Sequence, residues 1–306
     1  MKTITTVNII GLGALGMMYG RNLTEALGTD NVHFVMDEKR LEKASSQTFT
    51  VNGEKACFSF VSVSEASPAD LVLVAVKYPG LESAIRDMST SVGDDTVIMS
   101  VLNGISSEKI IAETYGNERL IYTVAQGMDA TKFGSDLNYS SQGTLFIGYG
   151  EGTTGENIKA VEDVLVRANL SCKVEDDIMF RIWSKYMLNV GVNQTCMVYG
   201  TTYHGVLHDD EPRMVLISAM REVIAVANAE GINLTEKDLN AYVELLTTLK
   251  GDLMPSMAQD RINRKPCEVD AFSGELIRLA KKHGVLVPVN EYLNRRAHEI
   301  EKEYIL

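Results

Sequence analysis

The stretch that decides the fold of the amino-terminal half reads Thr5-Thr-Val-Asn-Ile-Ile-Gly-Leu-Gly-Ala-Leu-Gly16. Its apolar run predicts a buried strand, and the G-x-G-x-x-G pattern that follows opens a predicted helix. In that setting Gly11 permits a tight turn, Gly13 lets a pyrophosphate approach the backbone, and Gly16 lets the helix pack on the strand. The N–H groups at the start of the helix would face the phosphates. We therefore predict a dinucleotide-binding loop, rather than a glycine-rich turn without a ligand, formed by Gly11, Leu12, Gly13, Ala14, Leu15 and Gly16.

Short β-branched runs alternate with helix-like segments through the first half of the chain. This alternation is typical of βαβ units around a parallel sheet. Two of the runs are almost wholly apolar, as strands buried on both faces should be. The predicted strands are Thr5 to Ile10, Val32 to Met36, Leu71 to Val76, Thr96 to Ser100, Leu120 to Ala125 and Thr144 to Tyr149.

From Asp177 onward the sequence has the pattern of helices. Three acidic residues precede Pro212 at a predicted helix start, and Thr235 with Asp238 forms a T-x-x-D capping pattern. Gly284 ends the helical segment that begins near Glu268. We therefore predict an α/β chain of two domains, a dinucleotide-binding domain at residues 1–176 and an all-helical domain at 177–306.

The composition of the 306 residues is that of a globular protein, with 45% apolar and 23% charged residues. The formal charge of −12 gives no general attraction for nucleic acid or an anionic membrane. The longest apolar runs are far shorter than the roughly 18 residues of a membrane helix. The apolar run from Val7 to Tyr19 holds patterned glycines and no small-x-small cleavage site, so we interpret it as structure rather than as a signal peptide.

The cysteines lie far apart, without a C-x-x-C pair. This spacing favours reduced thiols over a disulfide framework or a zinc site. We expect a cytoplasmic protein without a metal. The four residues are Cys57, Cys172, Cys196 and Cys267.

The second predicted strand ends at Asp37, 21 residues after Gly16. An acidic side chain there accepts hydrogen bonds from the adenosine ribose and repels a 2′-phosphate, which favours NAD(H). Lys39 and Arg40 follow at once, and either could turn toward a 2′-phosphate. The remaining interpretation is that Asp37 only caps the following helix.

A polar row interrupts the long apolar helix predicted for residues 178–198. Lys185, Asn189 and Asn193 are spaced at i, i+4 and i+8, so they line one face over about 12 Å. Buried polar groups without hydrogen bonds cost about 1 to 3 kcal/mol each, so the row needs partners, which a substrate could supply. The alternative is a row that faces water, with the Lys185 ammonium reaching the solvent.

A lysine beside a nicotinamide has a plausible chemical role. When hydride reaches a carbonyl carbon, an ammonium stabilises the charge on the oxygen and donates a proton. Burial would lower the pKa of Lys185 toward the working range. A second polar cluster contains Ser256 and Glu268, although Glu268 could instead complement a helix dipole.

Several motifs in order and spacing resemble the ketopantoate reductase (2-dehydropantoate 2-reductase) family nearly end to end. In the first half they are Gly11-Leu-Gly-Ala-Leu-Gly16, Val74-Ala-Val-Lys77, Leu102-Asn103-Gly104 and Gly143-Thr-Leu-Phe-Ile-Gly148. In the second half they are Trp183-Ser-Lys185 with Asn189 and Asn193, Pro255-Ser256-Met257 with Gln259-Asp260, Glu268-Val-Asp270 and His283-Gly-Val-Leu-Val-Pro288.

The resemblance implies a Rossmann domain followed by a helical domain like that of 6-phosphogluconate dehydrogenase. It implies reduction of 2-dehydropantoate to (R)-pantoate by NADPH, on the route to pantothenate and coenzyme A. Lys185 then corresponds to the catalytic lysine, and Asn189 and Asn193 to ligands of the substrate hydroxyl. Ser256 corresponds to the ligand of the substrate carboxylate, and Glu268 to the acid that holds the substrate and the lysine network.

Two further residues acquire roles by the same resemblance. Asn103 would lie near the nicotinamide ribose and the reacting carbonyl, and Lys77 would contact the cofactor. Taken alone, Asn103 could be a turn residue before glycine, and Lys77 a strand-end lysine that reaches water. The chain departs from the family where NADPH users carry a basic residue instead of Asp37, and where an asparagine before glycine is replaced by His204.

The cofactor is therefore NADP(H) by resemblance, with NAD(H) open because of Asp37. The expected partner is a small 2-oxo acid, and the sequence leaves open whether a second copy of the chain forms a homodimer with the first. Two other functions stay open. One is a related reductase of another 2-oxo acid or a 2-keto lactone, and the other is a dinucleotide-binding regulatory protein without catalysis.

Overall fold

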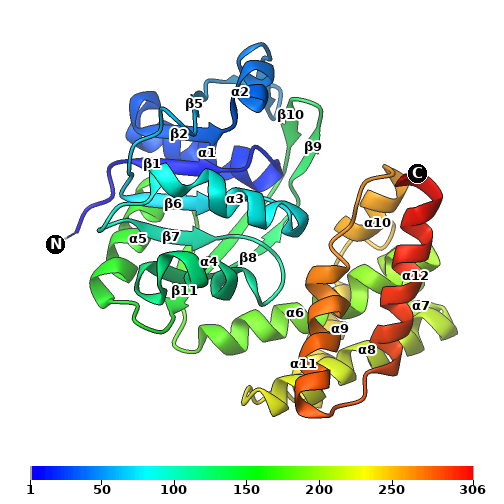
Figure 1. Ribbon diagram of the computed structural model, residues 1–306. Coiled ribbons are helices and arrows are strands. Elements are labelled where there is room, and N and C mark those ends of the chain that lie inside the picture. Colours follow the sequence, from blue (N-terminus) through cyan, green and yellow to red (C-terminus); the bar gives the residue numbers. More distant parts are fainter. Residues whose placement is uncertain (1, 306) are drawn as a thin grey trace. The chain divides into compact units, whose positions relative to one another are not determined.

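The computed structural model describes residues 2–305, and the chain folds as two compact units. The first unit extends to Asn103 and resumes over Ser107–Ile178. The second unit consists of Gly104–Ser106 and the residues from Met179 onward. Figure 1 shows the mixed sheet of the first unit and the helices of the second.

An eight-stranded sheet forms the centre of the first unit, in the order β12-β11-β8-β7-β6-β1-β2-β5. All neighbouring strands are parallel except β8 and β11. Every residue of β1 and β6 is buried, which explains why their sequences are apolar throughout. The strands are β1 (Val7–Ile10), β2 (Val32–Met36), β5 (Ser59–Ser62), β6 (Leu71–Val74), β7 (Val97–Ser100), β8 (Leu120–Met128), β11 (Gln142–Tyr149) and β12 (Cys172–Val174).

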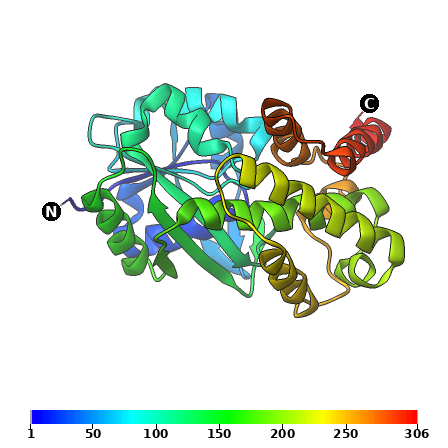
Figure 2. The ribbon, with the colours of Figure 1, turned by 90° about the horizontal axis from the view of Figure 1, so that it is seen from below.

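Helices cover both faces of this sheet, as Figures 1 and 2 show. Side chains of α1 and α5 pack with one face of the strands, and those of α3 and α4 pack with the other. The α-helices are α1 (Ala14–Leu27), α2 (Glu38–Ser45), α3 (Leu81–Asp87), α4 (Ser107–Tyr115) and α5 (Gly155–Arg167). Four short 3-10 turns join them to strands, η1 (Thr29–Asn31), η2 (Tyr78–Gly80), η3 (Ser89–Ser91) and η4 (Asn117–Arg119).

A second, four-stranded sheet was not predicted from the sequence. Its order is β4-β3-β10-β9, formed by β3 (Phe49–Val51), β4 (Glu54–Ala56), β9 (Thr131–Phe133) and β10 (Asp136–Asn138). Each strand has three residues, which is too short for an alternating pattern to stand out. The turn between β3 and β4 has both Asn52 and Gly53 at positive φ, so this Asn-Gly pair was the available hairpin signal.

All six predicted strands of the large sheet are present; Val32–Met36 has the predicted ends, and the other five differ at one end. The strand predicted from Leu71 to Val76 stops at Val74, because the chain turns away after the Ala75 N–H donates to the Ile10 carbonyl. The strand predicted to end at Ala125 continues to Met128, because it pairs with β11 as far as Gln142. Antiparallel pairing between distant segments therefore extends strands beyond their apolar runs.

Helices are the regular secondary structure of the second unit, and none of its described residues forms a strand. Its longest helix, α6, holds the predicted polar row and is flanked by buried apolar side chains. Thr235 and Asp238 form the predicted capping box, and Gly284 ends α11 in the left-handed conformation. The helices are α6 (Ile178–Tyr199), α7 (Tyr203–His208), α8 (Asp210–Ala229), α9 (Glu236–Thr247), α10 (Ser256–Ile262), the π-helix η5 (Asp270–Gly274), α11 (Glu275–His283) and α12 (Pro288–Ile305).

None of the helices within residues 2–305 combines the length and the apolar character that a membrane crossing requires.

Candidate functional site

The glycine loop connects β1 to α1 with a geometry that explains two of its glycines. Gly11 has φ +117°, and a Cβ there would lie 2.5 Å from the Ala75 carbonyl oxygen. A Cβ on Gly16 would lie 2.0 Å from the Gly11 carbonyl oxygen. The fold itself therefore requires glycine at both positions.

Gly13 differs from its two neighbours in the motif. A Cβ on Gly13 would lie 3.6 Å from the Ala75 carbonyl oxygen, which is an ordinary van der Waals distance. Gly13 is the cap residue of α1 and has no side chain to occupy the first N–H groups of the helix. The packing tolerates a methyl group here, so close approach of a phosphate is the better reason for this glycine. The loop thus fits a dinucleotide pyrophosphate.

The remaining cofactor-side candidates follow neighbouring parallel strands. Asp37 follows β2, the glycine loop follows β1, Lys77 comes shortly after β6, and Asn103 comes shortly after β7. These four strands are adjacent in the order β7-β6-β1-β2. Because the carboxyl ends of parallel strands meet at one edge, the fold brings the four positions to one side of the sheet, where ligands bind in folds of this class.

Asp37 is the N-terminal cap of α2. This agrees with the interpretation of Asp37 as a helix cap, which was one of the two drawn from the sequence. Its Oδ1 accepts the Arg40 backbone N–H at 2.8 Å, and its other oxygen pairs with the Arg40 guanidinium. The same guanidinium contacts the Asp87 carboxylate at 2.5 Å. Hydrogen bonds from Arg40 hold the pKa of Asp37 below its usual range. Lys39 is exposed.

The asparagines predicted from the polar row are joined to Ser256 in one hydrogen-bonded chain. Asn193 Nδ2 donates to Asn189 Oδ1 at 3.2 Å, and the Ser256 hydroxyl donates to Asn193 Oδ1 at 3.0 Å. The Met257 backbone N–H also donates to that oxygen, at 3.4 Å. Asn189 and Asn193 are 9% and 5% exposed, whereas Ser256 is exposed at the start of α10. Three residues predicted from distant motifs therefore meet.

Lys185 and Glu268 are electrostatically coupled within the same unit. Burial lowers the pKa of Lys185 to about 8, and the nearby Glu268 carboxylate opposes that shift. The Glu268 side chain is only 6% exposed. Its backbone carbonyl accepts the Ala271 N–H at 3.0 Å at the start of η5, so the helix-start interpretation describes its main chain but not the burial of its carboxylate. The ammonium of Lys185 is thus poised to release a proton near neutral pH.

Sequence reasoning missed two features of these units. The π-helix at Asp270–Gly274 follows directly after Glu268, and π-helical turns occur frequently at functional sites. No periodicity signal distinguishes such a turn from an α-helix. The second missed feature is the buried carboxyl of Glu108 in the first turn of α4, for which a glutamate after two serines at a helix start was the only signal.

His204, which departs from the family pattern, lies in the short helix α7. Its ring centroid is 4.3 Å from that of His208, one helical turn later. Its backbone N–H donates to the Gly251 carbonyl at 2.8 Å. The contacts of His204 therefore hold α7 against the segment that leads into α10.

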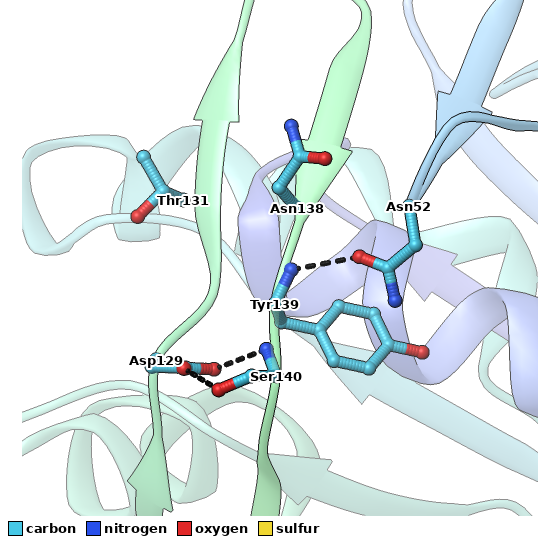
Figure 3. Close-up of a pocket in the computed structure, with 6 residues that line it drawn as sticks. All are labelled: Asn52, Asp129, Thr131, Asn138, Tyr139 and Ser140. Atoms are coloured by element: carbon cyan, nitrogen blue, oxygen red, sulfur yellow. Dashed lines mark hydrogen bonds between the residues drawn. The ribbon is translucent and has the colours of Figure 1, made fainter.

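A cavity of about 410 Å³ lies elsewhere, in the first unit beside the small sheet. Figure 3 shows the Asn52 and Asp129 side chains hydrogen-bonded to nearby residues. Asn52 Oδ1 accepts the Tyr139 N–H at 2.9 Å, and Asp129 Oδ1 accepts the Ser140 N–H at 2.8 Å. None of the residues that line it belongs to the predicted site. They are Asn52, Asp129, Thr131, Asn138, Tyr139 and Ser140.

Within residues 2–305 no cluster of three or more His, Cys, Asp or Glu side chains is arranged to hold a metal ion. The four cysteines are free thiols. Burial, with an added effect of Glu301, raises the pKa of Cys267, so its thiol stays protonated at neutral pH.

Two family models match the chain over most of its length. The model described as ketopantoate reductase PanE/ApbA matches residues 7–152, and its C-terminal counterpart matches residues 177–301. The 2-dehydropantoate 2-reductase of Streptococcus pyogenes serotype M1 is 23% identical over 302 residues, covering 96% of this chain and 97% of the relative. That of Archaeoglobus fulgidus is 26% identical over 299 residues, covering 97% and 98%. An uncharacterized oxidoreductase of Bacillus subtilis, YkpB, is 24% identical, covering 96% and 99%.

Solved structures share the whole fold at low sequence identity. D-mandelate dehydrogenase with NADH and anilino(oxo)acetate has a TM-score of 0.87 and 22% identity, covering 98% of this chain and 99% of that one. The 2-dehydropantoate 2-reductase of Geobacter metallireducens has a TM-score of 0.85 and 24% identity, covering 96% and 99%. A dimeric ketopantoate reductase of Staphylococcus aureus has a TM-score of 0.82 and 20% identity, covering 98% and 99%. The predicted α/β fold class, a dinucleotide-binding sheet followed by a helical region, is confirmed.

Proposed function

The chain belongs to the ketopantoate reductase family of oxidoreductases, and from this premise we propose that it reduces ketopantoate to (R)-pantoate. The observation that carries the proposal is the combination of a low-pKa lysine with the hydrogen-bonded chain of Asn189, Asn193 and Ser256 in one unit. A lysine whose pKa is about 8 can donate a proton at neutral pH. A chain of amide and hydroxyl groups offers donors and acceptors to a hydroxy acid.

The proposed reaction adds a hydride to C2 and a proton to its oxygen. The glycine loop would hold a reduced nicotinamide dinucleotide, which would supply the hydride when bound. The Lys185 ammonium stabilises the charge that develops on the carbonyl oxygen, donates its proton there, and is left as a neutral amine that solvent reprotonates. Glu268 favours the charged form of Lys185 before the transfer.

The other residues of the second unit would orient the substrate. Asn193 has two N–H donors and uses one of them on Asn189, so the pair can present N–H groups to a substrate hydroxyl. The Ser256 hydroxyl lies at the exposed start of α10 and would bind the carboxylate. We further propose that Asn103 and Lys77 contact the nicotinamide side from the edge of the sheet. In this scheme residues 1–176 hold the cofactor and residues 177–306 supply the catalytic and substrate-binding groups.

We propose NADH as the preferred cofactor. Asp37 and Asp87 share the single guanidinium of Arg40, so this cluster carries an excess of negative charge. A 2′-phosphate would be repelled by it, whereas ribose hydroxyls can donate to Asp37. D-mandelate dehydrogenase, a neighbour in fold, was solved with NADH. NADPH, which the family resemblance suggests, would require Arg40 or Lys39 to turn toward the phosphate.

A second candidate is reduction of another 2-oxo acid or of a 2-keto lactone. It is favoured by the D-mandelate dehydrogenase neighbour, because that protein shares the fold and was solved with an oxo acid derivative. A dinucleotide-binding regulatory protein is less well supported, since a sensor would have no need of Lys185 and its hydrogen-bonded neighbours. We also propose a cytoplasmic homodimer, because the thiols are free and a fold neighbour from Staphylococcus aureus is dimeric.

The test is steady-state oxidation of NADH and of NADPH, assayed separately with ketopantoate, 2-oxoisovalerate and a 2-keto lactone. We expect the highest kcat/KM with ketopantoate and NADH. If ketopantoate gives no better kcat/KM than 2-oxoisovalerate, the substrate assignment is wrong. If the chain binds a dinucleotide but turns over none of the three, the regulatory function replaces catalysis.

A further inference from the structure

Glu108 is a buried carboxyl in the first unit that the proposed reaction does not use. It lies in the first turn of α4 and is 4% exposed. The Ser107 hydroxyl donates to Glu108 Oε2 at 2.7 Å, and the Ser100 hydroxyl donates to Ser107 Oγ at 2.9 Å. The Leu102 backbone N–H points to Ser100 Oγ at 3.4 Å. The carboxyl thus begins a relay of two buried hydroxyls that ends on a backbone amide.

This relay closes the loop that carries Asn103. Ser100 is the last residue of β7 and Ser107 the first residue of α4, so their hydrogen bond joins the two ends of residues 101–106. A backbone hydrogen bond with Thr123 ties Glu108 to β8 as well. The relay therefore connects β7, β8 and α4 at the base of this loop.

The surroundings of Glu108 make its charge sensitive to pH. Burial raises the pKa of Glu108 to about 7, although Ser107 and the backbone N–H groups of Glu108 and Thr123 oppose the shift. From β8 the ionisable group that faces it is the Tyr122 phenol, whose pKa is raised by burial and by Glu108. The Ser107 hydroxyl from α4 contacts it directly, and the Ser100 hydroxyl at the end of β7 contacts it through Ser107.

We propose that Glu108 is a positioning residue, which holds the loop of residues 101–106 and hence Asn103 through Ser107 and Ser100. Ionised, the carboxylate accepts from Ser107 in a charge-assisted hydrogen bond, and the relay runs from Ser100 to Glu108. Protonated, the carboxyl still accepts from Ser107 through its carbonyl oxygen, but this hydrogen bond loses its charge assistance, which weakens the relay that ends on the Leu102 amide. The effect on the reaction rests on the proposed role of Asn103, whereas the effect on the loop does not.

Hydrogen exchange of the backbone amides at residues 101–106 tests the inference in the free protein, without substrate. After correction for the intrinsic pH dependence, we expect protection against local opening of the loop, with Glu108 still buried, to rise with pH around a midpoint near 7. Glu108→Gln should remove this pH dependence and raise the exchange rates of the loop amides about fivefold. That increase corresponds to the loss of about one hydrogen bond. Glu113→Gln removes a charge from an exposed position of the same helix and should behave as the wild type. A wild-type pH profile in Glu108→Gln would overturn the inference.

Ser107→Ala supplies an independent variant, because it cuts the relay and leaves Glu108 in place. Ser107→Ala should raise the exchange rates of the loop amides about as much as Glu108→Gln does. Unchanged protection of these amides would contradict the proposed relay. If Glu108→Gln does not fold, this variant alone decides. In turnover, Glu108→Gln should lower kcat and remove an ionisation near pH 7 while the dissociation constant of the dinucleotide stays nearly constant. Absence of turnover in the wild type would refute the proposed function. The exchange data would still test whether Glu108 holds the loop of residues 101–106.

Discussion

The Ser256 hydroxyl donates to the side-chain oxygen of Asn193 at 3.0 Å, joining residues that are 63 positions apart. This hydrogen bond holds the start of α10 against α6. It also brings together two groups that sequence motifs assigned separately to the substrate. The same oxygen receives the Met257 backbone N–H, so Asn193 has a structural role in addition to its proposed ligand role.

Ser256→Ala should therefore raise the KM for the 2-oxo acid about tenfold with little change in Tm, because the hydroxyl is exposed and Asn193 Oδ1 keeps its hydrogen bond from the Met257 N–H. Asn193→Ala should raise KM and also destabilise the fold by about 1 to 3 kcal/mol. The buried Asn189 side chain and the Met257 N–H would both lose their hydrogen bond to the Asn193 amide. Thermal unfolding and steady-state kinetics on both variants would check this. Equal losses of Tm would show that Ser256 has a structural role instead.

Lys185→Ala should lower kcat by about a hundredfold or more through loss of the proton donor. Dinucleotide affinity should stay nearly unchanged, because the glycine loop lies in the other unit. Since the pKa of Lys185 is lowered to about 8, the wild-type kcat should fall as the pH rises above that value and the ammonium is lost. Lys237→Ala, at an exposed position of the same unit, is the matched control and should leave the pH profile intact. Wild-type turnover in Lys185→Ala would eliminate this residue as the acid.

Gly13→Ala and Gly16→Ala should separate ligand binding from folding. A methyl group on Gly13 meets only an ordinary contact, so this variant should keep its Tm and bind the dinucleotide at least tenfold more weakly. A methyl group on Gly16 would lie 2.0 Å from the Gly11 carbonyl oxygen, so that variant should lose stability. Calorimetric titration and thermal unfolding give the two quantities. Full dinucleotide affinity in Gly13→Ala would argue against phosphate binding at this loop.

Asp37→Ser should shift cofactor preference toward NADPH by about tenfold or more. Serine still caps α2, so the helix should be preserved while the charge that repels a 2′-phosphate is removed and Arg40 is released. The readout is the ratio of kcat/KM for the two cofactors. Asp87→Asn also loosens Arg40 but leaves Asp37 in place, and it should shift the ratio less. A wild type that already prefers NADPH would contradict the proposed role of Asp37.

Glu108 should make the stability of the protein depend on pH. Its folded-state pKa of about 7 lies above the ordinary glutamate value of 4.5, so folding favours the protonated form. The contribution is fully present below the unfolded-state pKa and is lost as the pH rises through about 7, with a total near 3 kcal/mol. Denaturant unfolding at about pH 5 and about pH 8 should show this slope, and Glu108→Gln should lack it. Identical slopes in the two proteins would mean that Glu108 does not titrate in this range.

Much of the architecture could be predicted from local pattern. The glycine loop, the buried strands and the long helix α6 have periodicities or motifs contained in fewer than about 25 consecutive residues. The row of Lys185, Asn189 and Asn193 followed from helical geometry alone. Strands β3, β4, β9 and β10 were missed because each is three residues long, and because the pairing that joins the two hairpins into one sheet, with Asp136 opposite Thr50, links segments far apart in sequence.

The sequence by itself determined which residues stand at the ends of the parallel strands and along one face of α6, because strand and helix periods place side chains locally. Only the tertiary structure decided that Ser256 meets Asn193, that Asp37 shares Arg40 with Asp87, and that Glu108 is buried. Such contacts depend on how whole elements pack. Burial and distance then set the pKa values and hydrogen bonds on which the proposed chemistry depends.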